Sequence, residues 1–175
     1  STEYNSRYKT YIDKFTFYKR LMFKLNYPVD NFVLPSTNGK MFSLADNSGK
    51  NLVIYFYPKD DTPGCTTEGQ DFRDNWGAFT ERNCIIVGVS RDSIESHEKF
   101  KEKMEFPFEL LSDSEETVCK LFDVLKMKNM YGKQVLGIGR STFVIDVEGI
   151  LRKEWRDVKV AGHVQEVLDF VSTMH

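Results

Sequence analysis

The chain has 175 residues, a mass of 20.4 kDa and a formal net charge of −2, from 24 Lys and Arg against 26 Asp and Glu. This length predicts one domain with at most a short appendage, and the near balance of charge excludes a strong overall field for nucleic acids or membrane surfaces. Hydrophobic residues make up 41% and aromatic residues 14% of the chain. That composition is typical of a folded globular protein and not of a disordered one.

The sequence offers no segment for membrane insertion or secretion. Its longest uninterrupted apolar run, Leu52 to Tyr57, has six residues, whereas a membrane-spanning helix needs about 20. There is no apolar stretch of a secretory signal and no Asn-x-Ser/Thr glycosylation motif. The three cysteines, Cys65, Cys84 and Cys119, are odd in number and widely spaced. We therefore expect an intracellular, reducing compartment, with cytoplasm, nucleus and organelle left open.

Residues 1–27 differ from the rest of the chain. The first 26 residues carry six Lys or Arg and two Asp or Glu, a net charge of +4, interleaved with Tyr and Phe. We expect an N-terminal extension that packs its aromatic residues on the domain. A remnant of a targeting sequence and an arm that contacts nucleic acid or a protein partner are the alternatives. We expect no nucleic-acid contact elsewhere.

The domain, residues 28–175, is predicted to begin with a hairpin and then a strand–helix unit. Asn38-Gly39 is a hairpin turn signal between the apolar segments 32–34 and 41–44. The run 52–57 has the composition of a buried strand. From Cys65 onward, apolar residues recur at helical spacing, which predicts a helix that Cys65 opens while pointing to the core. The other residues on that apolar face are Phe72, Trp76 and Phe79.

Two further strand–helix units are predicted. The apolar strand 84–89 is followed by a helix capped near Asp92, with Glu95 three residues on. The strand 108–111 is followed by a helix whose start is indicated by Asp113 and Glu116. The apolar stripe of that helix comprises Val118, Leu121, Phe122 and Leu125.

The last predicted elements are a hairpin and a helix. Segments 141–147 and 150–155 flank the turn Glu148-Gly149, and apolar residues at helical spacing predict an amphipathic helix over 160–171. This order of elements predicts an α/β fold, a thioredoxin-like sandwich with a central mixed β-sheet flanked by helices.

Residues 57–68 carry the clearest chemical signature of the chain. They link a predicted buried strand to a predicted helix. Pro63 suits the first turn of a helix, and Gly64 leaves backbone N–H groups open towards a ligand. Cys65 then lies among unpaired N–H donors at the positive end of a helix dipole, which stabilises a thiolate over a thiol. This placement predicts a reactive cysteine, and an inert core cysteine is the alternative.

Within this segment, the spacing Pro58-x-x-x-Thr62-x-x-Cys65 resembles the active-site signature of the peroxiredoxin family. The continuous match from Thr62 to Thr66, with Glu68, is similar to the PrxQ branch, also called bacterioferritin comigratory protein.

A second segment, Arg140 to Asp146, resembles the arginine-bearing strand of the same family. Both motifs stand in the family's order, and the resemblance covers roughly residues 28–174. It implies a peroxiredoxin-type sandwich and a thiol-dependent peroxidase that reduces hydrogen peroxide and organic hydroperoxides without a cofactor or metal.

The resemblance also implies a set of residue roles. Cys65 would be the peroxidatic cysteine, whose thiolate attacks one peroxide oxygen and becomes a sulfenic acid. Because charge spreads over both oxygens in the transition state, the site needs donors aimed at both. The family assigns this work to the Thr62 hydroxyl, the Arg140 guanidinium and the backbone N–H groups of Gly64 and Cys65.

Two further residues have supporting roles by the same resemblance. Pro58 shields the pocket from water. Glu68, three residues after Cys65 and so on a neighbouring helix face, orients the arginine.

The sequence departs from many PrxQ proteins at position 70. Those proteins carry a resolving cysteine five residues after the peroxidatic one, whereas this chain has Gln70. Cys84 and Cys119 lie in segments patterned for burial, where a structural thiol is expected. We favour a one-cysteine cycle with glutathione, glutaredoxin or thioredoxin as reductant. A two-cysteine cycle that uses Cys84 or Cys119 remains the alternative.

A different class of function is the alternative to a peroxidase. A redox sensor or binding module that passes its oxidation to a partner protein would show the same site chemistry. Metal binding is disfavoured because His97, His163 and His175 are isolated and no C-x-x-C pair exists, which also disfavours a dithiol oxidoreductase. A dinucleotide loop at Gly137 is disfavoured because Thr142 occupies the third glycine position. Monomer and dimer are both left open.

Overall fold

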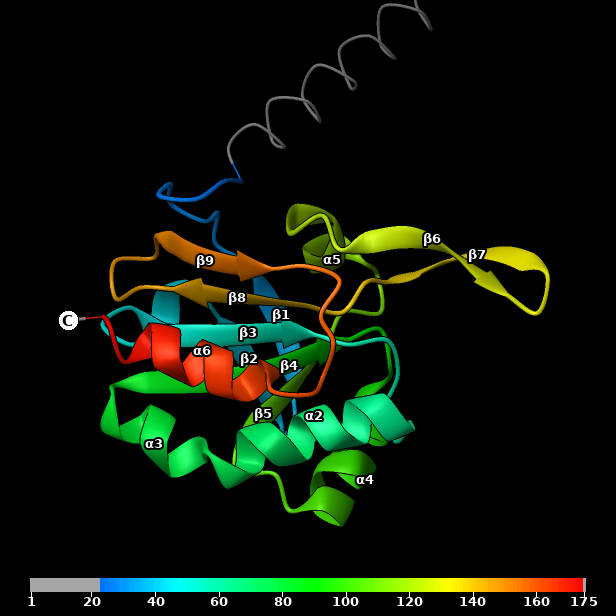
Figure 1. The fold of residues 1–175 in the computed structure, drawn as a ribbon, viewed down its shortest axis with the longest axis horizontal. Coiled ribbons are helices and arrows are strands. Elements are labelled where there is room, and N and C mark those ends of the chain that lie inside the picture. The colour runs from blue at the N-terminus through cyan, green and yellow to red at the C-terminus, as the bar shows by residue number, and fades with distance from the viewer. Residues whose placement is uncertain (1–22, 175) are drawn as a thin grey trace, which may run out of the picture.

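The computed structural model of the protein describes residues 23–174. A seven-stranded mixed sheet with strand order β2-β1-β5-β4-β3-β8-β9 forms its body, and a two-stranded hairpin, β6-β7, extends away from that body (Figure 1). The strands of the large sheet are β1 (Val33–Ser36), β2 (Lys40–Ser43), β3 (Asn51–Phe56), β4 (Cys84–Ser90), β5 (Glu109–Ser112), β8 (Ser141–Ile145) and β9 (Leu151–Trp155). The hairpin pairs β6 (Leu125–Met130) with β7 (Lys133–Ile138).

Helices cover both faces of the large sheet, which confirms the predicted α/β sandwich with a central mixed sheet. One face carries α2 (Pro63–Asp74), α3 (Trp76–Glu81), α4 (Ile94–Met104) and α6 (His163–Val171). The short helix α5 (Thr117–Leu121) packs on the other face, and a 3-10 turn, η1 (Ala45–Asn47), follows β2. No helix in residues 23–174 is both long and apolar enough to cross a membrane.

Strand β3 lies at the centre of the body and divides the core in two. All six of its residues are buried, as expected for a strand with both faces covered. Because side chains alternate along a strand, its odd and even positions enter different cores. Leu52, Ile54 and Phe56 pack with α5, whereas Val53, Tyr55 and Tyr57 pack with α2, α3, α4 and α6.

The N-terminal segment of the described chain runs along the core on the α5 side. The ring of Phe23 lies 4.8 Å from that of Phe122 and 5.7 Å from that of Phe143, measured between centroids. The backbone N–H of Asn26 donates to the Leu151 carbonyl at 2.7 Å. Most of the predicted extension, residues 1–22, lies outside the described residues, so its role stays a prediction.

Strand direction and register bring three loops to one edge of the sheet. Strands β3, β4 and β5 run parallel, so their carboxyl ends meet at the same edge. Strand β8 runs antiparallel to β3 and pairs Ser141 with Phe56, the last residue of β3. Arg140, directly before β8, therefore lies beside the segment that follows β3.

The predicted helix from Cys65 is broken where the apolar pattern seemed to continue. Helix α2 begins at Pro63 and ends at Asp74, and Asn75 separates it from α3. Cys65 and Phe79 are buried as predicted, but Trp76 is 39% exposed, so its assignment to the apolar face is wrong. Trp76 is the first residue of α3, directly after the break, and does not continue the apolar face of α2.

The cap of α4 lies one residue after Asp92, near which it was predicted. Helix α4 begins at Ile94, and the side chain of Ser93 caps it by accepting from the N–H of Ser96. Asp92, the predicted cap, instead accepts from the backbone N–H of Asp60 at 3.0 Å. Sequence spacing does not show this partner, because Asp60 and Asp92 follow different strands and meet only at the edge of the sheet.

Sequence analysis extended the helix after Asp113 to Leu125 and named no strand between that helix and residue 141, and both points are wrong. Helix α5 ends at Leu121, and Leu125 begins β6. The β6-β7 turn at Tyr131 and Gly132 has positive φ at both residues, as a type I′ turn requires. Asn or Asp is usual at the first of these positions. Because Tyr131 occupies it here, the sequence lacks the usual signal for a hairpin turn.

We predict that Gly69 of α2 is required for close packing on Phe106. A Cβ at Gly69 would lie 2.9 Å from Cε1 of the Phe106 ring, and a ring buried in the core cannot move aside freely. Gly69→Ala should lower the free energy of unfolding in urea by about 1–3 kcal/mol. Gly77→Ala in α3 is the control, because its Cβ would meet nothing within 4 Å and helix propensity favours alanine. Equal stability of the two variants would contradict the prediction.

Candidate active site

The segment between β3 and α2 leaves the first turn of the helix open. Thr62 is the N-cap residue by its extended backbone, but its hydroxyl donates to the Lys59 carbonyl at 2.8 Å and caps no helical N–H. The first helical hydrogen bond runs from Thr66 N–H to the Thr62 carbonyl. The N–H groups of Gly64 and Cys65 therefore have no carbonyl partner inside the helix. These donors are what an anion at this position would meet.

Cys65 lies in that turn, beside the guanidinium of Arg140. The cysteine is 3% exposed, and Nη2 of Arg140 donates to its Sγ at 3.5 Å. Nη1 of the same group donates to Oε1 of Glu68 at 2.7 Å. The arginine thus joins two side chains three residues apart on α2 to the start of β8.

Gly64 allows the guanidinium to lie against the turn. A Cβ at this position would come within 3.1 Å of Nη2 of Arg140. Any larger residue would push the guanidinium away from Cys65 or shift the turn. Gly64 is therefore needed here for space, since its backbone is not in the left-handed region.

Burial destabilises the charged form of Glu68 at this position. Burial raises the pKa of Glu68 to about 7, although the charge and hydrogen bond of Arg140 oppose the shift. Its Oε2 has no hydrogen-bond partner among residues 23–174, and neither has the buried hydroxyl of Tyr55. Burial alone would lower the pKa of Arg140, but the neighbouring charges of Glu68 and Cys65 raise it above its usual value. The arginine is held in its charged form.

The structure brings together most of the residues that sequence analysis assigned to the site. Cys65, Glu68 and Arg140 are in direct contact, and Gly64 lies against the arginine. Thr62 lies one residue before α2. Pro58 is half-buried at the beginning of the same loop, next to the buried Tyr57. The functional roles of these six residues remain the subject of the proposal below.

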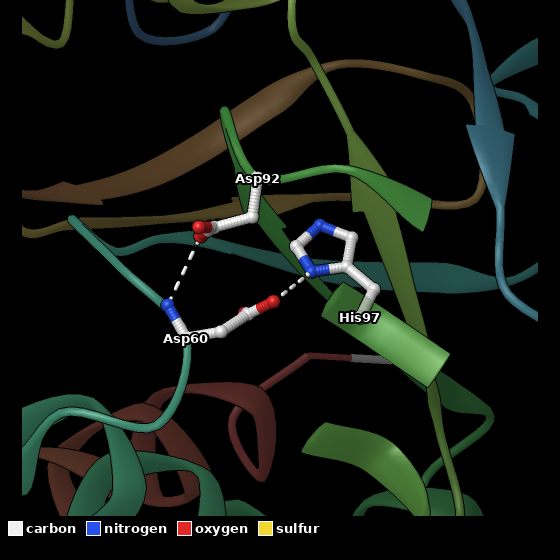
Figure 2. Close-up of side chains that lie close together, drawn as sticks. All are labelled: Asp60, Asp92 and His97. Atoms are coloured by element: carbon white, nitrogen blue, oxygen red, sulfur yellow. Dashed lines mark hydrogen bonds and ion pairs between the residues drawn. The ribbon is translucent and has the colours of Figure 1, made fainter. Parts of the chain in front are cut away.

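Three residues that sequence analysis did not place in the site form a cluster behind the loop. Figure 2 shows Asp60 between Asp92 and His97, and their nearest side-chain atoms lie within 4.8 Å of one another. Sequence analysis treated His97 as isolated, which is wrong, because its Nδ1 lies 2.7 Å from Oδ2 of Asp60. The cluster's ligand atoms are engaged in hydrogen bonds within the protein, and we assign no metal to it. The sequence signal for this cluster is that Asp60 follows the end of one predicted strand and Asp92 follows the end of the next.

Lys128 of the hairpin is a further residue that sequence analysis missed. Its ammonium group donates to the Ile138 carbonyl, and its side chain packs where Gly137 has no Cβ. Burial lowers the pKa of Lys128, and the charges of Arg140 and Cys65 act on it as well. The hairpin thus brings a second cation towards the site.

The other two cysteines lie away from Cys65. Cys84 is the first residue of β4 and pairs with Asn51, at the opposite end of the strands from the active loop; five residues of strand span about 16 Å. Cys119 belongs to the core on the other face of the sheet. Burial raises the pKa of Cys84 to about 12, and burial also raises the pKa of Cys119, as does its neighbour Asp113. No disulfide joins the three cysteines, all of which the structure describes.

The fold and the site together define a thioredoxin-like protein in which a buried cysteine at a helix amino end faces an arginine, the arrangement of a thiol peroxidase. The model of the AhpC/TSA family matches residues 25–154. The chain therefore belongs to the AhpC/TSA family and, within it, to the Bcp or PrxQ peroxiredoxins, which are thiol-dependent peroxidases. This confirms the resemblance and the thioredoxin-like fold predicted from the sequence.

Individual relatives agree over most of their length. Peroxiredoxin Bcp of Bacillus subtilis is 53% identical over 141 residues, 81% of this chain and 90% of that protein. A structure of the bacterioferritin comigratory protein of Xanthomonas campestris superposes with a TM-score of 0.77 at 51% identity, covering 81% of this chain and 90% of that one. A PrxQ mutant of Xylella fastidiosa gives a TM-score of 0.81 at 42% identity, covering 85% and 95%.

We predict that Glu68 makes stability pH-dependent. Its pKa in the folded chain, about 7, exceeds the ordinary value of 4.5. As the pH rises between these values, the unfolded chain releases this proton first, so the folded state loses stability. Relative to Glu68→Gln, which does not titrate, the wild-type free energy of unfolding should fall over this range by up to about 3 kcal/mol. Urea unfolding at several pH values measures it.

The exposed Glu81 of α3 provides the control, because Glu81→Gln should leave the pH profile of the wild type unchanged. Parallel profiles for the wild type and Glu68→Gln would contradict the prediction.

Proposed function

We propose that the chain reduces hydrogen peroxide and organic hydroperoxides at Cys65, in a one-cysteine cycle completed by an external thiol. The observation that carries the proposal is the guanidinium of Arg140, held 3.5 Å from Cys65 Sγ by its ion pair with Glu68. It places a fixed positive charge against the sulfur that must act as an anion. The Xanthomonas campestris relative is described by its alkyl peroxide reduction activity, which supports including organic hydroperoxides.

The first step transfers one oxygen atom to sulfur. The thiolate of Cys65 attacks the O–H-bearing oxygen of the peroxide; the S–O bond forms as the O–O bond breaks, and the leaving oxygen takes a proton from solvent and departs as water or an alcohol. Sulfur is oxidised to the sulfenic acid and the peroxide is reduced. The N–H groups of Gly64 and Cys65 and the guanidinium of Arg140 donate to the oxygens as charge develops on them.

Thr62 supplies an acceptor in this step. Because its hydroxyl proton is given to the Lys59 carbonyl at 2.8 Å, the lone pairs of Oγ1 are free to accept the hydrogen bond of the hydroperoxide O–H. This orients the peroxide with the same O–H-bearing oxygen towards sulfur, so that the other oxygen, which carries hydrogen or the alkyl group, is the one that leaves. Pro58, half-buried at the beginning of the loop, excludes water from the same pocket.

The second stage returns Cys65 to the thiol. A thiolate of the reductant attacks the sulfenic sulfur, forms a mixed disulfide and releases water. A second thiol then attacks that disulfide, so the reductant leaves oxidised. Cys84 lies at the far end of the strands and Cys119 lies on the opposite face of the sheet. Neither meets the Cα separation of about 7 Å that a disulfide demands without refolding part of the core.

Glutathione, glutaredoxin and thioredoxin are the reductants we propose, in a reducing intracellular compartment. The three cysteines are free thiols, two of them deep in the core. Such thiols persist where the cell keeps cysteine reduced.

The cysteine variants test this function. Cys65→Ser should lose peroxide reduction altogether, whereas the Cys84→Ser, Cys119→Ser double variant should keep near wild-type turnover with glutathione and glutaredoxin. Because a hydroxyl in an apolar core is costly, the alanine pair serves if the serine pair fails to fold. Mass spectrometry of the wild type after one equivalent of peroxide should show one oxygen added. A stoichiometric internal disulfide would overturn the one-cysteine cycle, and a single turnover that no thiol restores would indicate a sensor.

Arg140 variants separate charge from geometry. Arg140→Ala should slow oxidation of Cys65 by about 10²-fold or more, the scale for losing a transition-state donor. Arg140→Lys keeps a positive charge but cannot donate to Cys65 and Glu68 at once, so most of the loss should persist. Stopped-flow fluorescence with hydrogen peroxide measures both rates. A lysine variant as fast as the wild type would show that charge alone suffices.

A further inference from the structure

The loop that presents Thr62 and Cys65 is attached to the body mainly through one buried carboxylate. Asp60 accepts from the Tyr57 hydroxyl at 2.6 Å, and its Oδ2 lies 2.8 Å from the Ser96 hydroxyl and 2.7 Å from Nδ1 of His97. Its backbone N–H donates to Asp92 (Figure 2). Four contacts, from Tyr57 directly after β3, from α4 and from the segment before α4, therefore meet on a single loop residue.

The loop needs this attachment. Asp61, the next residue, has a φ of 55°, in the left-handed region that costs free energy for any residue other than glycine. Its side chain pairs with Lys103 at 2.9 Å, but both groups are more than half exposed, so that pair adds little. The buried contacts of Asp60 keep the strained turn in place.

The hydrogen-bond partners of His97 define its protonation. The ring is fully buried, with Nε2 2.8 Å from the Leu111 carbonyl and Nδ1 2.7 Å from Oδ2 of Asp60. A carbonyl only accepts, so Nε2 carries a proton. Asp60 already accepts from two hydroxyls, which favours the carboxylate and leaves Nδ1 to donate as well. The arrangement fits an imidazolium paired with a carboxylate.

The other groups that face the ring are consistent with this assignment. From the residue directly after β3, the Tyr57 hydroxyl lies 3.5 Å from Nδ1, and burial raises the pKa of Tyr57, so it stays neutral. From β5 only the Leu111 carbonyl contacts a ring nitrogen. The carboxylate of Asp92, before α4, accepts from Asp60 and Ser90 and adds a second negative charge nearby.

We propose that His97 is a positioning residue for the peroxide reaction: as an imidazolium held by β5, it fixes Asp60 and thereby the loop that aims Thr62 and Cys65 at the peroxide. The proposal rests on the proposed function only for its kinetic consequence. Because Cys65 is 3% exposed, a bulky thiol reaches the oxidised sulfur only when this loop opens. The same pair therefore favours peroxide attack and limits access of the reductant.

Two substitutions separate the contacts of His97. His97→Asn places an amide near Nδ1 and keeps a donor to Asp60, whereas His97→Gln reaches the position of Nε2, keeps a donor to Leu111 and leaves Asp60 without this partner. Phe100→Leu, in the core under the same helix, is the control for general destabilisation of α4. We expect His97→Gln to slow oxidation of Cys65 by on the order of 10- to 100-fold, and His97→Asn to recover most of that loss.

Two readouts do not depend on peroxidase activity. Amide hydrogen exchange of residues 58–65 and alkylation of Cys65 by a bulky reagent should both accelerate about tenfold or more in His97→Gln and stay near wild type in His97→Asn and Phe100→Leu. Nitrogen-15 NMR of the wild type at pH 7 should show both ring nitrogens protonated. If Cys65 proved not to reduce peroxide, these readouts would still test the positioning role.

The proposal is overturned by either of two results. One is equal behaviour of His97→Gln and Phe100→Leu in exchange and alkylation, which would mean that His97 only stabilises its helix. The other is a neutral His97 ring at pH 7.

Discussion

The guanidinium of Arg140 is the constraint on which the rest of this structure depends. It must lie within hydrogen-bond reach of a carboxylate that has no exposure to water and of a sulfur that is almost as buried. Removing the guanidinium would leave the buried carboxylate of Glu68 without its partner. An unpaired buried charge destabilises the fold far more than a buried ion pair does. The pairing of Ser141 with Phe56, the absence of a Cβ at Gly64 and the start of α2 at Pro63 all serve to keep this contact in place.

Sequence reasoning indicated a reactive Cys65 because its signal is local, whereas Thr62 and Arg140 were assigned through the resemblance to a known family. A proline and a glycine before Cys65 indicate an open helix start, and the segment from Arg140 to Asp146 has the pattern of a buried strand. It could not find Asp60 and His97, which lie 37 residues apart and meet only because β3 and β4 are parallel neighbours. Nothing in the periodicity of α4 distinguishes a histidine that faces a carboxylate from one that fills a core.

The elements that sequence reasoning missed share a physical cause. The hairpin β6-β7 stands away from the body, and large apolar residues such as Met127 and Tyr131 are exposed on it. With no core to bury one face, its burial does not follow the two-residue period that identifies a strand. Trp76 was misplaced for a related reason, because a helical pattern continues through Asn75 although the helix does not.

The division of the core by β3 has a consequence for variation in this protein. Cys65 packs on the side of the sheet that carries α2 and α4, whereas the aromatic cluster around Phe122 and Phe143 lies on the other side. We expect substitutions in that cluster to act through the packing of the core, and so on stability. We therefore expect the α5 side to be where substitutions change thermal tolerance more than reactivity, provided that β3 and β8 keep their register, and an engineer seeking a more heat-stable peroxidase would begin there.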